Sequence, residues 1–415
     1  MFDAPGQAPT KFTADFLDRV PNRFVFATGI ECSAPRIASG ERHDQLVKTG
    51  HWTRYAEDAR LVRELGIPFL RYGIPFHVVA LDPGRLDWEW TDRALDALTT
   101  EGIEPIADLL HFAIPDDLEG MGDRRLVGRF LDFADAFAAR YPWIRWYTPV
   151  NEPYITALFS GKNGIWNERG TTDAAFVRAL DNIVECAVRG TEAIRSRRPD
   201  AVILQSDACD RYAPAVPEAS PLAAFLDERR YVGFDLTLGR VPEPSVVAWL
   251  DRNGLDERRV AWFMDHAVRD GFIVGLDYYD GNERLVDVDG SVTSSPAPWG
   301  LAGMTRPYVE RYGRPLMVAE TNQWASHAVG WLDELWADVV TMRDEGLPFV
   351  GFCWYSLTDQ VDWDIQLRED RGRLNTLGLV DLDRNYRPVG LRYRELARDV
   401  AAGVFESGDD RRRVA

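Results

Sequence analysis

Phe24-Val25-Phe26-Ala27-Thr28 is a continuous apolar run, and Gly29-Ile30-Glu31-Cys32-Ser33 follows it directly. The run predicts a strand that is buried on both faces, as in a parallel sheet. The segment after it lacks the G-x-G-x-x-G turn of a doubly wound dinucleotide-binding sheet. No G-x-x-x-x-G-K-[ST] phosphate loop occurs elsewhere in the chain. Together these patterns favour a closed barrel over a doubly wound sheet.

Alternating strand and helix patterns extend this prediction along the whole chain. Eight strands are expected, at 24–28, 69–73, 104–110, 146–150, 202–205, 272–279, 316–319 and 349–355. Helical patterns fall at 54–65, 92–99, 124–140, 173–197, 306–312, 331–345 and 390–402. Eight βα units in sequence predict a single (β/α)₈ TIM barrel over residues 1–405. A stretch at about 221–270, broken near 233–244, is interpreted as one helix plus an insertion, and the charged tail 406–415 is expected to fray.

Composition excludes several classes of partner. The 415 residues carry a net charge of −18 and a sequence pI near 4.9. An acidic chain disfavours binding to nucleic acids and to anionic membranes, because both need basic patches. Four scattered cysteines without a C-x-x-C pair are typical of reduced thiols. With no apolar leader in residues 1–10 and no apolar run of about 18 residues, we expect a cytoplasmic protein.

Polar side chains gather where the predicted strands end, which is where barrel active sites are built. Glu152 directly follows the fourth strand and Glu320 directly follows the seventh. These strands face each other across the barrel mouth, so the two carboxyl groups can hold a substrate between them. Such a pair suits glycoside hydrolysis, in which one carboxyl protonates the leaving oxygen and the other attacks the anomeric carbon. A separation of about 5–5.5 Å implies retention of configuration and roughly 6.5–9.5 Å implies inversion.

The segments around these glutamates resemble those of the family 1 glycoside hydrolases, the β-glucosidase type. The resemblance covers nearly the whole chain, and six segments carry it in order. Residues 148–153, TPVNEP, are similar to the family's T-x-N-E-P, with one extra residue before Asn. Residues 318–322, VAETN, are similar to its I-T-E-N-G. The other four are LLHFAIP at 109–115, GLDYY at 275–279, YSLTDQVDW at 355–363, and LGLVD at 377–381 with Arg387-Pro388 after it.

The resemblance implies roles for individual residues. Glu152 would be the acid/base and Glu320 the nucleophile, with Arg71 and Tyr279 contacting the nucleophile carboxylate. The sugar contacts that it implies are Asn151 at the 2-hydroxyl, His111 near the 3-hydroxyl, and Asp362 and Trp363 at the 4- and 6-hydroxyl end. Asp277 and Tyr355 also fall at positions that would touch the sugar.

The chain departs from the family pattern at several of these positions. Asp277 stands in place of Asn, Asp362 of Glu, Phe112 of Trp and Tyr355 of Trp. The Gln that ends the family's first strand, and that binds the sugar there, is missing from this chain. We expect Glu31 to make part of the sugar contacts of that Gln. These departures fall on sugar contacts rather than on the catalytic pair, so the reaction class is better defined than the sugar.

The sequence therefore predicts a retaining β-glycosidase without a cofactor, acting on a glycoside or an oligosaccharide. Its histidines lack metal-ligand spacing, so no metal is expected. A transglycosylase using the same glutamates, an endo-acting β-glycanase and a non-catalytic sugar-binding barrel remain as alternatives. Product analysis with an acceptor alcohol would identify a transglycosylase, and a rate that depends on oligosaccharide length would identify an endo-acting enzyme. Sugar affinity without turnover would identify the non-catalytic barrel. The sequence leaves the sugar, the aglycone and the oligomeric state undefined.

Overall fold

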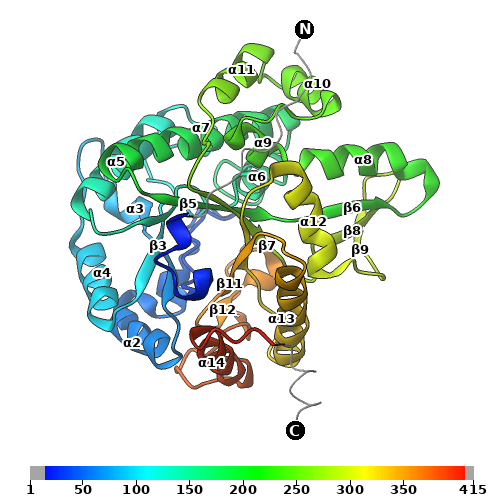
Figure 1. The fold of residues 1–415 in the computed structure, drawn as a ribbon. Coiled ribbons are helices and arrows are strands. Elements are labelled where there is room, and N and C mark those ends of the chain that lie inside the picture. Colours follow the sequence, from blue (N-terminus) through cyan, green and yellow to red (C-terminus); the bar gives the residue numbers. More distant parts are fainter. Residues whose placement is uncertain (1–14, 407–415) are drawn as a thin grey trace.

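A computed structural model describes residues 15–406 of the chain. Eight parallel strands close into a barrel, in the order β1-β11-β10-β7-β5-β4-β3-β2 (Figure 1). All eight strands predicted from the sequence are present, and the predicted TIM barrel is confirmed. Their bounds are β1 Val25–Gly29, β2 Phe69–Gly73, β3 Glu104–Asp108, β4 Trp146–Thr148, β5 Val202–Ala208, β7 Phe272–Asp277, β10 Leu316–Glu320 and β11 Phe349–Trp354.

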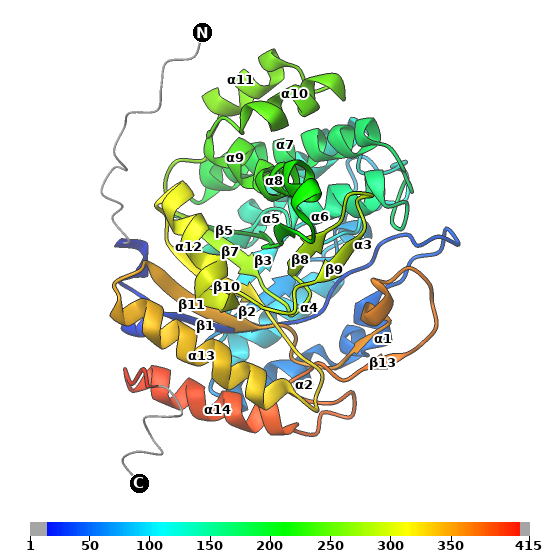
Figure 2. The ribbon, with the colours of Figure 1, turned by 90° about the vertical axis from the view of Figure 1, so that its right-hand side faces the viewer.

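Helices cover the outside of the barrel, as the alternating pattern predicts. The long ones are α2 His51–Glu64, α4 Glu89–Glu101, α5 Arg125–Arg140, α7 Asp173–Arg197, α12 Gly300–Tyr312, α13 Ala328–Asp344 and α14 Pro388–Ala401. Figure 2 shows α13 and α14 side by side along one flank. Short helices α1 Gln45–Lys48, α3 Phe76–Val79 and α6 Pro153–Ala157 lie in the loops.

The segment after β5 differs from the expectation of one helix plus an insertion. It forms four helices: α8 Ser220–Arg229, α9 Val232–Leu238, α10 Pro244–Arg252 and α11 Glu257–Asp265. Helix α9 overlaps the break expected near 233–244. Its residues Val232 to Thr237 are all buried, so this helix has no polar face and leaves no amphipathic period in the sequence. The expected frayed tail 406–415 lies outside the described residues except for Glu406.

A small sheet that the sequence did not predict stands beside the barrel mouth. It consists of β6 Arg211–Pro214, β8 Glu283–Val286 and β9 Val292–Ser294, and we call it the rim sheet. Figure 1 shows it projecting to the right, below α8. These strands are only three or four residues long and mostly exposed or half-buried, so no apolar alternation marks them. A second short pair, β12 Gln360–Val361 and β13 Leu374–Asn375, lies after β11.

Alternation of side chains along the strands produces two apolar cores. Val25 and Ala27 of β1 point into the barrel, whereas Phe26 of β1 and Phe24 just before it pack against the helices. Leu17 and Val20 belong to the same inner core as Val25, so the segment before β1 contributes to it. The inner core fills the lower barrel, and polar side chains take the inward positions above it. The fold therefore delivers those polar groups to the C-terminal ends of the strands.

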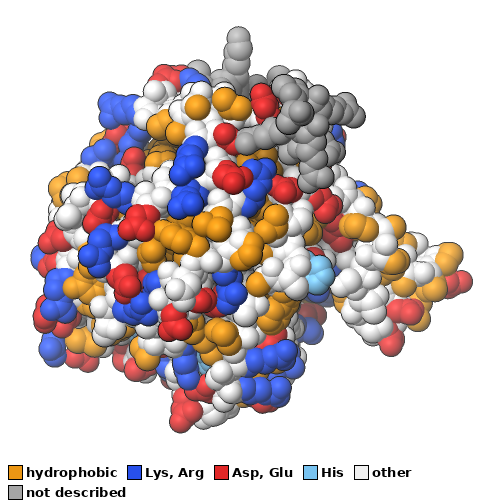
Figure 3. Space-filling view, turned by 90° about the horizontal axis from the view of Figure 1, so that it is seen from below, with side chains coloured by type: hydrophobic (Ala, Val, Ile, Leu, Met, Phe, Trp, Pro, Cys, Tyr) orange, Lys and Arg blue, Asp and Glu red, His pale blue; other side chains and the backbone are white. Residues whose placement is uncertain are grey.

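Charged side chains on the face shown in Figure 3 do not gather by sign. Over the described part of that face, Lys and Arg alternate with Asp and Glu among scattered apolar residues. None of the helices in residues 15–406 combines the length and apolar character that crossing a bilayer requires.

One buried ion network ties α2 to the loop before α14. The Asp58 carboxylate accepts hydrogen bonds from Arg384 Nε at 2.7 Å and Nη2 at 2.9 Å. His51 Nδ1 lies 2.7 Å from the same carboxylate, and His51 Nε2 lies 2.9 Å from the Tyr72 hydroxyl. Burial alone would raise the pKa of Asp58, but His51 and Arg384 outweigh it and lower the pKa below its ordinary value.

We expect Asp58→Ala to lower the free energy of unfolding by about 3–5 kcal/mol, because it leaves the buried Arg384 charge uncompensated. The matched control is Glu57→Ala, which removes an exposed partner of Arg54 on the same helix and should change stability by less than about 0.5 kcal/mol. A depressed carboxyl pKa contributes stability above its unfolded value of about 3.9. The difference between wild type and Asp58→Ala should therefore shrink as the pH falls below about 4. Urea unfolding at pH 7 and pH 3.5 measures both effects, and equal losses in the two variants would contradict the prediction.

Candidate active site

A cavity of about 460 Å³ opens at the C-terminal ends of the barrel strands. Its floor carries buried polar side chains from several strand ends: Glu31, His111, Glu152, Glu320 and Gln360. Its rim comes from the loops after β7, β10 and β11 and includes Tyr279, Asp280, Arg284, Trp324 and Trp363. Arg284 lies on β8, so the rim sheet forms part of the cavity wall.

An irregularity in strand pairing aims Glu320 into the cavity. Val318 pairs with Leu276 on β7, but Glu320 pairs with Asp277, so Ala319 is an extra residue between them. A bulge of this kind redirects the side chain that follows it. Glu320 lines the cavity floor although the preceding Ala319 faces the inner core.

Two donors hold the Glu320 carboxylate. Arg71 Nη1 donates to Oε1 at 2.6 Å, and the Tyr279 hydroxyl donates to Oε2 at 2.9 Å. Arg71 faces into the barrel two residues after Phe69, as strand alternation requires. The contacts that the family resemblance implies for Arg71 and Tyr279 are thus present in the structure.

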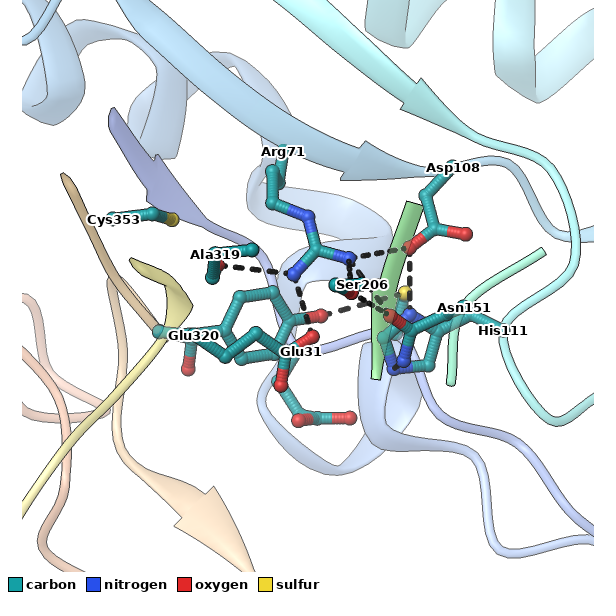
Figure 4. Close-up of polar contacts among 12 residues, drawn as sticks. Glu31, Arg71, Asp108, His111, Asn151, Ser206, Ala319, Glu320 and Cys353 are labelled. Carbon is teal, nitrogen blue, oxygen red and sulfur yellow. Dashed lines mark hydrogen bonds and ion pairs between the residues drawn. The ribbon is translucent and has the colours of Figure 1, made fainter. Parts of the chain in front are cut away.

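Arg71 also joins the floor of the site into one network. Its Nη2 lies 3.2 Å from an Asp108 carboxylate oxygen and donates to Asn151 Oδ1 at 2.8 Å. Figure 4 shows the guanidinium lying between Glu320 on one side and Asp108 on the other. A fully buried guanidinium with fixed partners cannot swing away, so Glu320 has one defined position.

Glu152 is held by its backbone rather than by its side chain. It has a left-handed φ of 42° and directly precedes α6, which begins at Pro153. Its N–H donates to the carbonyl of Ser206 at 3.0 Å, which fixes it against β5. The carboxyl group makes no side-chain hydrogen bond to the described residues and lines the cavity. Burial raises the pKa of Glu152 well above its usual range, and the nearby Asp277, Glu320 and Asp207 add to this effect.

Asp277 lies beneath the two glutamates and has no exposed surface. Neither of its carboxylate oxygens makes a hydrogen bond of normal geometry to the described residues, although Ser206 lies near enough to lower its pKa slightly against the other effects. Burial, and then the neighbouring Glu320, raise the pKa of Asp277 well above its usual range, although Arg71 opposes the shift. A charge on Asp277 is therefore costly, and where Asp277 is ionised it raises the pKa of Glu152.

His111 is oriented by Asp108 three residues earlier. His111 Nδ1 lies 2.9 Å from Asp108 Oδ2, and its Nε2 lies 3.3 Å from the Asn151 amide nitrogen. Its ring lies parallel to that of Tyr355 at 6.0 Å between centroids. Burial opposes a charge on the imidazole, but Cys32 and Asp108 raise the pKa of His111 above its ordinary value. His111 is thus a fixed hydrogen-bonding group at the cavity floor.

The predicted site residues divide into three groups by position. The cavity is lined by Glu31, His111, Glu152, Tyr279, Glu320 and Trp363. Four others lie just beneath it and contact or support those residues: Arg71, Asn151, Asp277 and Tyr355. Asp362 belongs to neither group, because its carboxylate accepts hydrogen bonds from the backbone N–H groups of residues 371, 372 and 373 and lies 3.0 Å from His43 Nε2. Asp362 therefore does not line the cavity in this structure, and its sugar contact stays a prediction.

Several residues of the site were not predicted. Gln360 lines the floor and lies inside the segment that carries the resemblance, two residues before Asp362, so the segment signalled its presence but not its orientation. Asp108 ends β3 and orients His111, and its place at a strand end was the available signal. Asp207 accepts the first free N–H of α6, from Tyr154, at 2.8 Å, and burial raises its pKa to about 8.

One group of potential metal donors lies away from the cavity floor, at His43, Asp362 and Asp370. Its donor atoms are already engaged: the Asp362 oxygens bind loop N–H groups, and Asp370 pairs with Lys48 at 2.6 Å. These contacts fit a structural role in holding the loop that follows Trp363.

Comparison with known proteins agrees with this geometry. The sequence model of glycosyl hydrolase family 1 matches residues 32–233. Beta-glucosidase A of Thermotoga maritima is 22% identical over 367 residues, which cover 79% of this chain and 81% of that protein. Thermostable beta-glucosidase B of Thermobispora bispora is 30% identical over 159 residues, covering 36% and 32%. A solved family 1 β-glucosidase from Thermotoga maritima has a TM-score of 0.79 at 17% identity, covering 92% of this chain and 98% of that one. The chain is thus similar to glycosyl hydrolase family 1 in sequence over residues 32–233 and has the fold of its solved β-glucosidases.

The family model and the relatives found by sequence are those of glycoside hydrolases, the class of enzyme that the sequence predicts. The matched residues 32–233 include Glu152, whereas Glu320 lies outside them.

Proposed function

We propose that this protein is a retaining β-glycosidase of family 1 that acts on small-molecule glycosides or oligosaccharides. In this proposal Glu320 is the nucleophile and Glu152 is the acid/base. One contrast supports the assignment: Glu320 is held by Arg71 and Tyr279, whereas the Glu152 carboxyl is free of side-chain partners in residues 15–406 and its pKa is raised. A nucleophile needs a fixed, ionised carboxylate, and an acid needs a proton at working pH.

The reaction would proceed in two displacements. In the first, a Glu320 oxygen bonds to the anomeric carbon, the bond to the leaving oxygen breaks, and Glu152 gives its proton to that oxygen. In the second, Glu152 takes a proton from water, the water oxygen bonds to the anomeric carbon, and the bond to Glu320 breaks. Arg71 and Tyr279 stabilise the Glu320 carboxylate when it is released. Each carboxyl returns to its starting state, and configuration is retained.

The pKa of Glu152 would change during this cycle. Negative charge on Glu320 contributes to the raised pKa of Glu152, and that charge disappears in the covalent intermediate. Loss of the charge lowers the pKa of Glu152, which can then act as a base toward water. One residue thereby serves as acid first and as base afterwards.

Trapping of the intermediate tests the proposal. The protein is incubated with a panel of 2-deoxy-2-fluoro β-glycosides that carry a good leaving group, and its intact mass is measured. We expect one stoichiometric adduct that maps to Glu320 and does not form in Glu320→Gln. The configuration of the first-formed sugar product is read by NMR during hydrolysis of the parent glycosides. A product of inverted anomeric configuration would overturn the retaining assignment.

Asp277→Asn should shift the pH dependence of activity. The acid must be protonated, so kcat/KM falls as the pH rises past the pKa of Glu152. Asp277 helps to keep that pKa high, and the amide has the same shape without a titratable group. In Asp277→Asn we expect the pKa of Glu152 to fall, so that the alkaline limb of the kcat/KM profile moves to lower pH by about one unit. Asp280→Asn, an exposed carboxylate at the rim, is the matched control and should shift the limb much less. An unchanged limb in a folded Asp277→Asn protein would contradict this role.

A further inference from the structure

The cavity floor has an excess of acidic groups. Three glutamates line it, Glu31, Glu152 and Glu320. Among the described residues the lining includes one Lys or Arg side chain, Arg284 at the rim, and that side chain already pairs with Asp210 at 2.9 Å. His111 also lines the floor, but its Nδ1 is engaged by Asp108 at 2.9 Å, so a ligand that enters the floor meets more carboxyl groups than unpaired basic side chains.

Glu31 is the floor glutamate that neither forms an ion pair nor serves as a catalytic group in the proposed reaction. It is only 2% exposed, and its Oε1 accepts a hydrogen bond from the Ser33 N–H at 2.8 Å. Its other oxygen has no partner in the described chain, and no ion pair to Lys, Arg or His reaches the residue. Buried carboxylates are normally paired with a cation or fully hydrogen-bonded.

The other two floor glutamates are accounted for. Glu320 pairs with Arg71, and Glu152 carries the proton that the proposed reaction needs. Burial raises the pKa of Glu31, with His111 and Ser33 opposing the shift, so holding a charge there costs free energy that a cation in the cavity would offset. Glu31 is thus a buried acceptor that lines the cavity without a direct ion pair, since the nearby His111 is hydrogen-bonded to Asp108 at 2.9 Å.

A metal ion does not fit this position. The group of three potential metal donors found in residues 15–406 lies at His43, Asp362 and Asp370, and Glu31 is not part of it. An ammonium group on a sugar fits better, because it brings three N–H donors together with a positive charge. A charge-assisted hydrogen bond to a carboxylate is about twice as strong as one between neutral groups.

We propose that Glu31 selects a glycone that carries an amino group, as ammonium, on a ring or side carbon other than the anomeric carbon. The inference rests on the proposed glycosidase function, because it names the class of sugar that the same cavity accepts. Glu31 would contact that ammonium group directly and would be a substrate-binding residue rather than a member of the catalytic pair.

Steady-state kinetics with matched substrates tests the proposal. The panel is 4-nitrophenyl β-D-glucoside and its 2-amino, 3-amino, 4-amino and 6-amino deoxy analogues. We expect at least one amino glycoside to exceed the glucoside in kcat/KM by about tenfold or more. In Glu31→Gln that ratio should fall at least about tenfold, while kcat/KM for the glucoside changes less. The amide keeps the size and the hydrogen-bonding oxygen and removes only the charge.

A control variant separates local contact from the general negative field of the chain. Glu369→Gln removes one exposed carboxylate in the loop after Trp363, outside the cavity lining, and should leave the amino preference unchanged. A preference for the glucoside over every amino analogue in the wild-type protein would overturn the inference. Equal loss for amino and neutral substrates in Glu31→Gln would do the same and would leave the hydrolase function standing.

Binding measurements decide the inference even if turnover is absent. Isothermal titration calorimetry with free glucose and the corresponding free amino sugars measures the Kd of each sugar without catalysis. Tighter binding of one amino sugar in the wild-type protein, lost in Glu31→Gln, supports the inference. Weaker or equal binding of all of them overturns it. Failure of the proposed hydrolase would appear instead as binding of these sugars without release of nitrophenol.

Discussion

Glu320→Ala is expected to reduce kcat/KM for aryl β-glycosides by about five orders of magnitude, the scale on which enzymes lose activity when a covalent nucleophile is removed. No carboxylate oxygen is then in place to attack the anomeric carbon, although Glu152 can still protonate the leaving group. The structure gives a reason to expect no substitute: Asp277, the carboxyl that pairs with Glu320 across the strands, has no exposed surface and does not line the cavity.

Azide rescue makes this prediction specific to a role. Alanine at 320 leaves space on the nucleophile side, so added azide should attack the anomeric carbon and restore part of the rate. The product should be the glycosyl azide of inverted configuration, because one displacement has replaced two. Glu320→Gln keeps the volume and should show the same loss without rescue. An azide product of retained configuration would assign the nucleophile elsewhere.

A folding control is needed because both variants remove the negative charge of the carboxylate that lies closest to Arg71. Arg71 keeps its contacts with Asp108 and Asn151, so the guanidinium remains paired. We therefore expect the two Glu320 variants to stay folded. Far-ultraviolet circular dichroism and a thermal melt check this directly.

Glu152→Ala is expected to give a loss that depends on the leaving group. A general acid contributes about 10²- to 10⁴-fold, and most where the leaving oxygen is basic. For alkyl glycosides, kcat/KM should fall by about a thousandfold or more. For 2,4-dinitrophenyl glycosides it should change little, because that leaving group departs without a proton. A uniform loss across leaving groups would indicate a structural rather than an acid role.

The second half of the cycle gives an independent check on Glu152. Without a base, water attacks the glycosyl enzyme slowly, so the intermediate should accumulate with 2,4-dinitrophenyl substrates and kcat should drop. Azide needs no base and should raise kcat, giving a glycosyl azide of retained configuration. The opposite azide stereochemistry in the Glu152 and Glu320 variants would distinguish the two roles within one experiment.

The barrel and the position of Glu152 and Glu320 at its mouth could be predicted from sequence because both depend on short, local patterns. Continuous apolar runs mark strands that are buried on both faces, and a polar residue directly after such a run lies at the barrel mouth. Arg71 follows the same logic, two residues beyond an inward-facing Phe69. Glu320 does not, since alternation alone would point it outward after Ala319, and the pairing irregularity redirects it.

The sugar end of the site could not be predicted, because long-range hydrogen bonds decide which polar residue faces the cavity. Gln360 and Asp362 are two residues apart in one segment. The backbone N–H groups of residues 371–373 donate hydrogen bonds to the Asp362 carboxylate, whereas the Gln360 side chain lines the floor. Nothing in residues 355–363 themselves encodes that choice. The rim sheet escaped prediction for a similar reason, since its short strands are stabilised by one another rather than by an apolar core.

The cavity wall is built from two kinds of element. Floor residues lie on or just after the ends of the barrel strands, so the barrel itself fixes their positions. Strands β6, β8 and β9 bond to one another through their own backbone, and Arg284 on β8 reaches the cavity from outside the barrel. Exchanging this appendage between homologues would alter which leaving group is accepted while the chemical machinery is inherited intact. Diversification of such an enzyme would therefore proceed by remodelling its wall, with sugar choice and leaving-group choice evolving on separate pieces of chain.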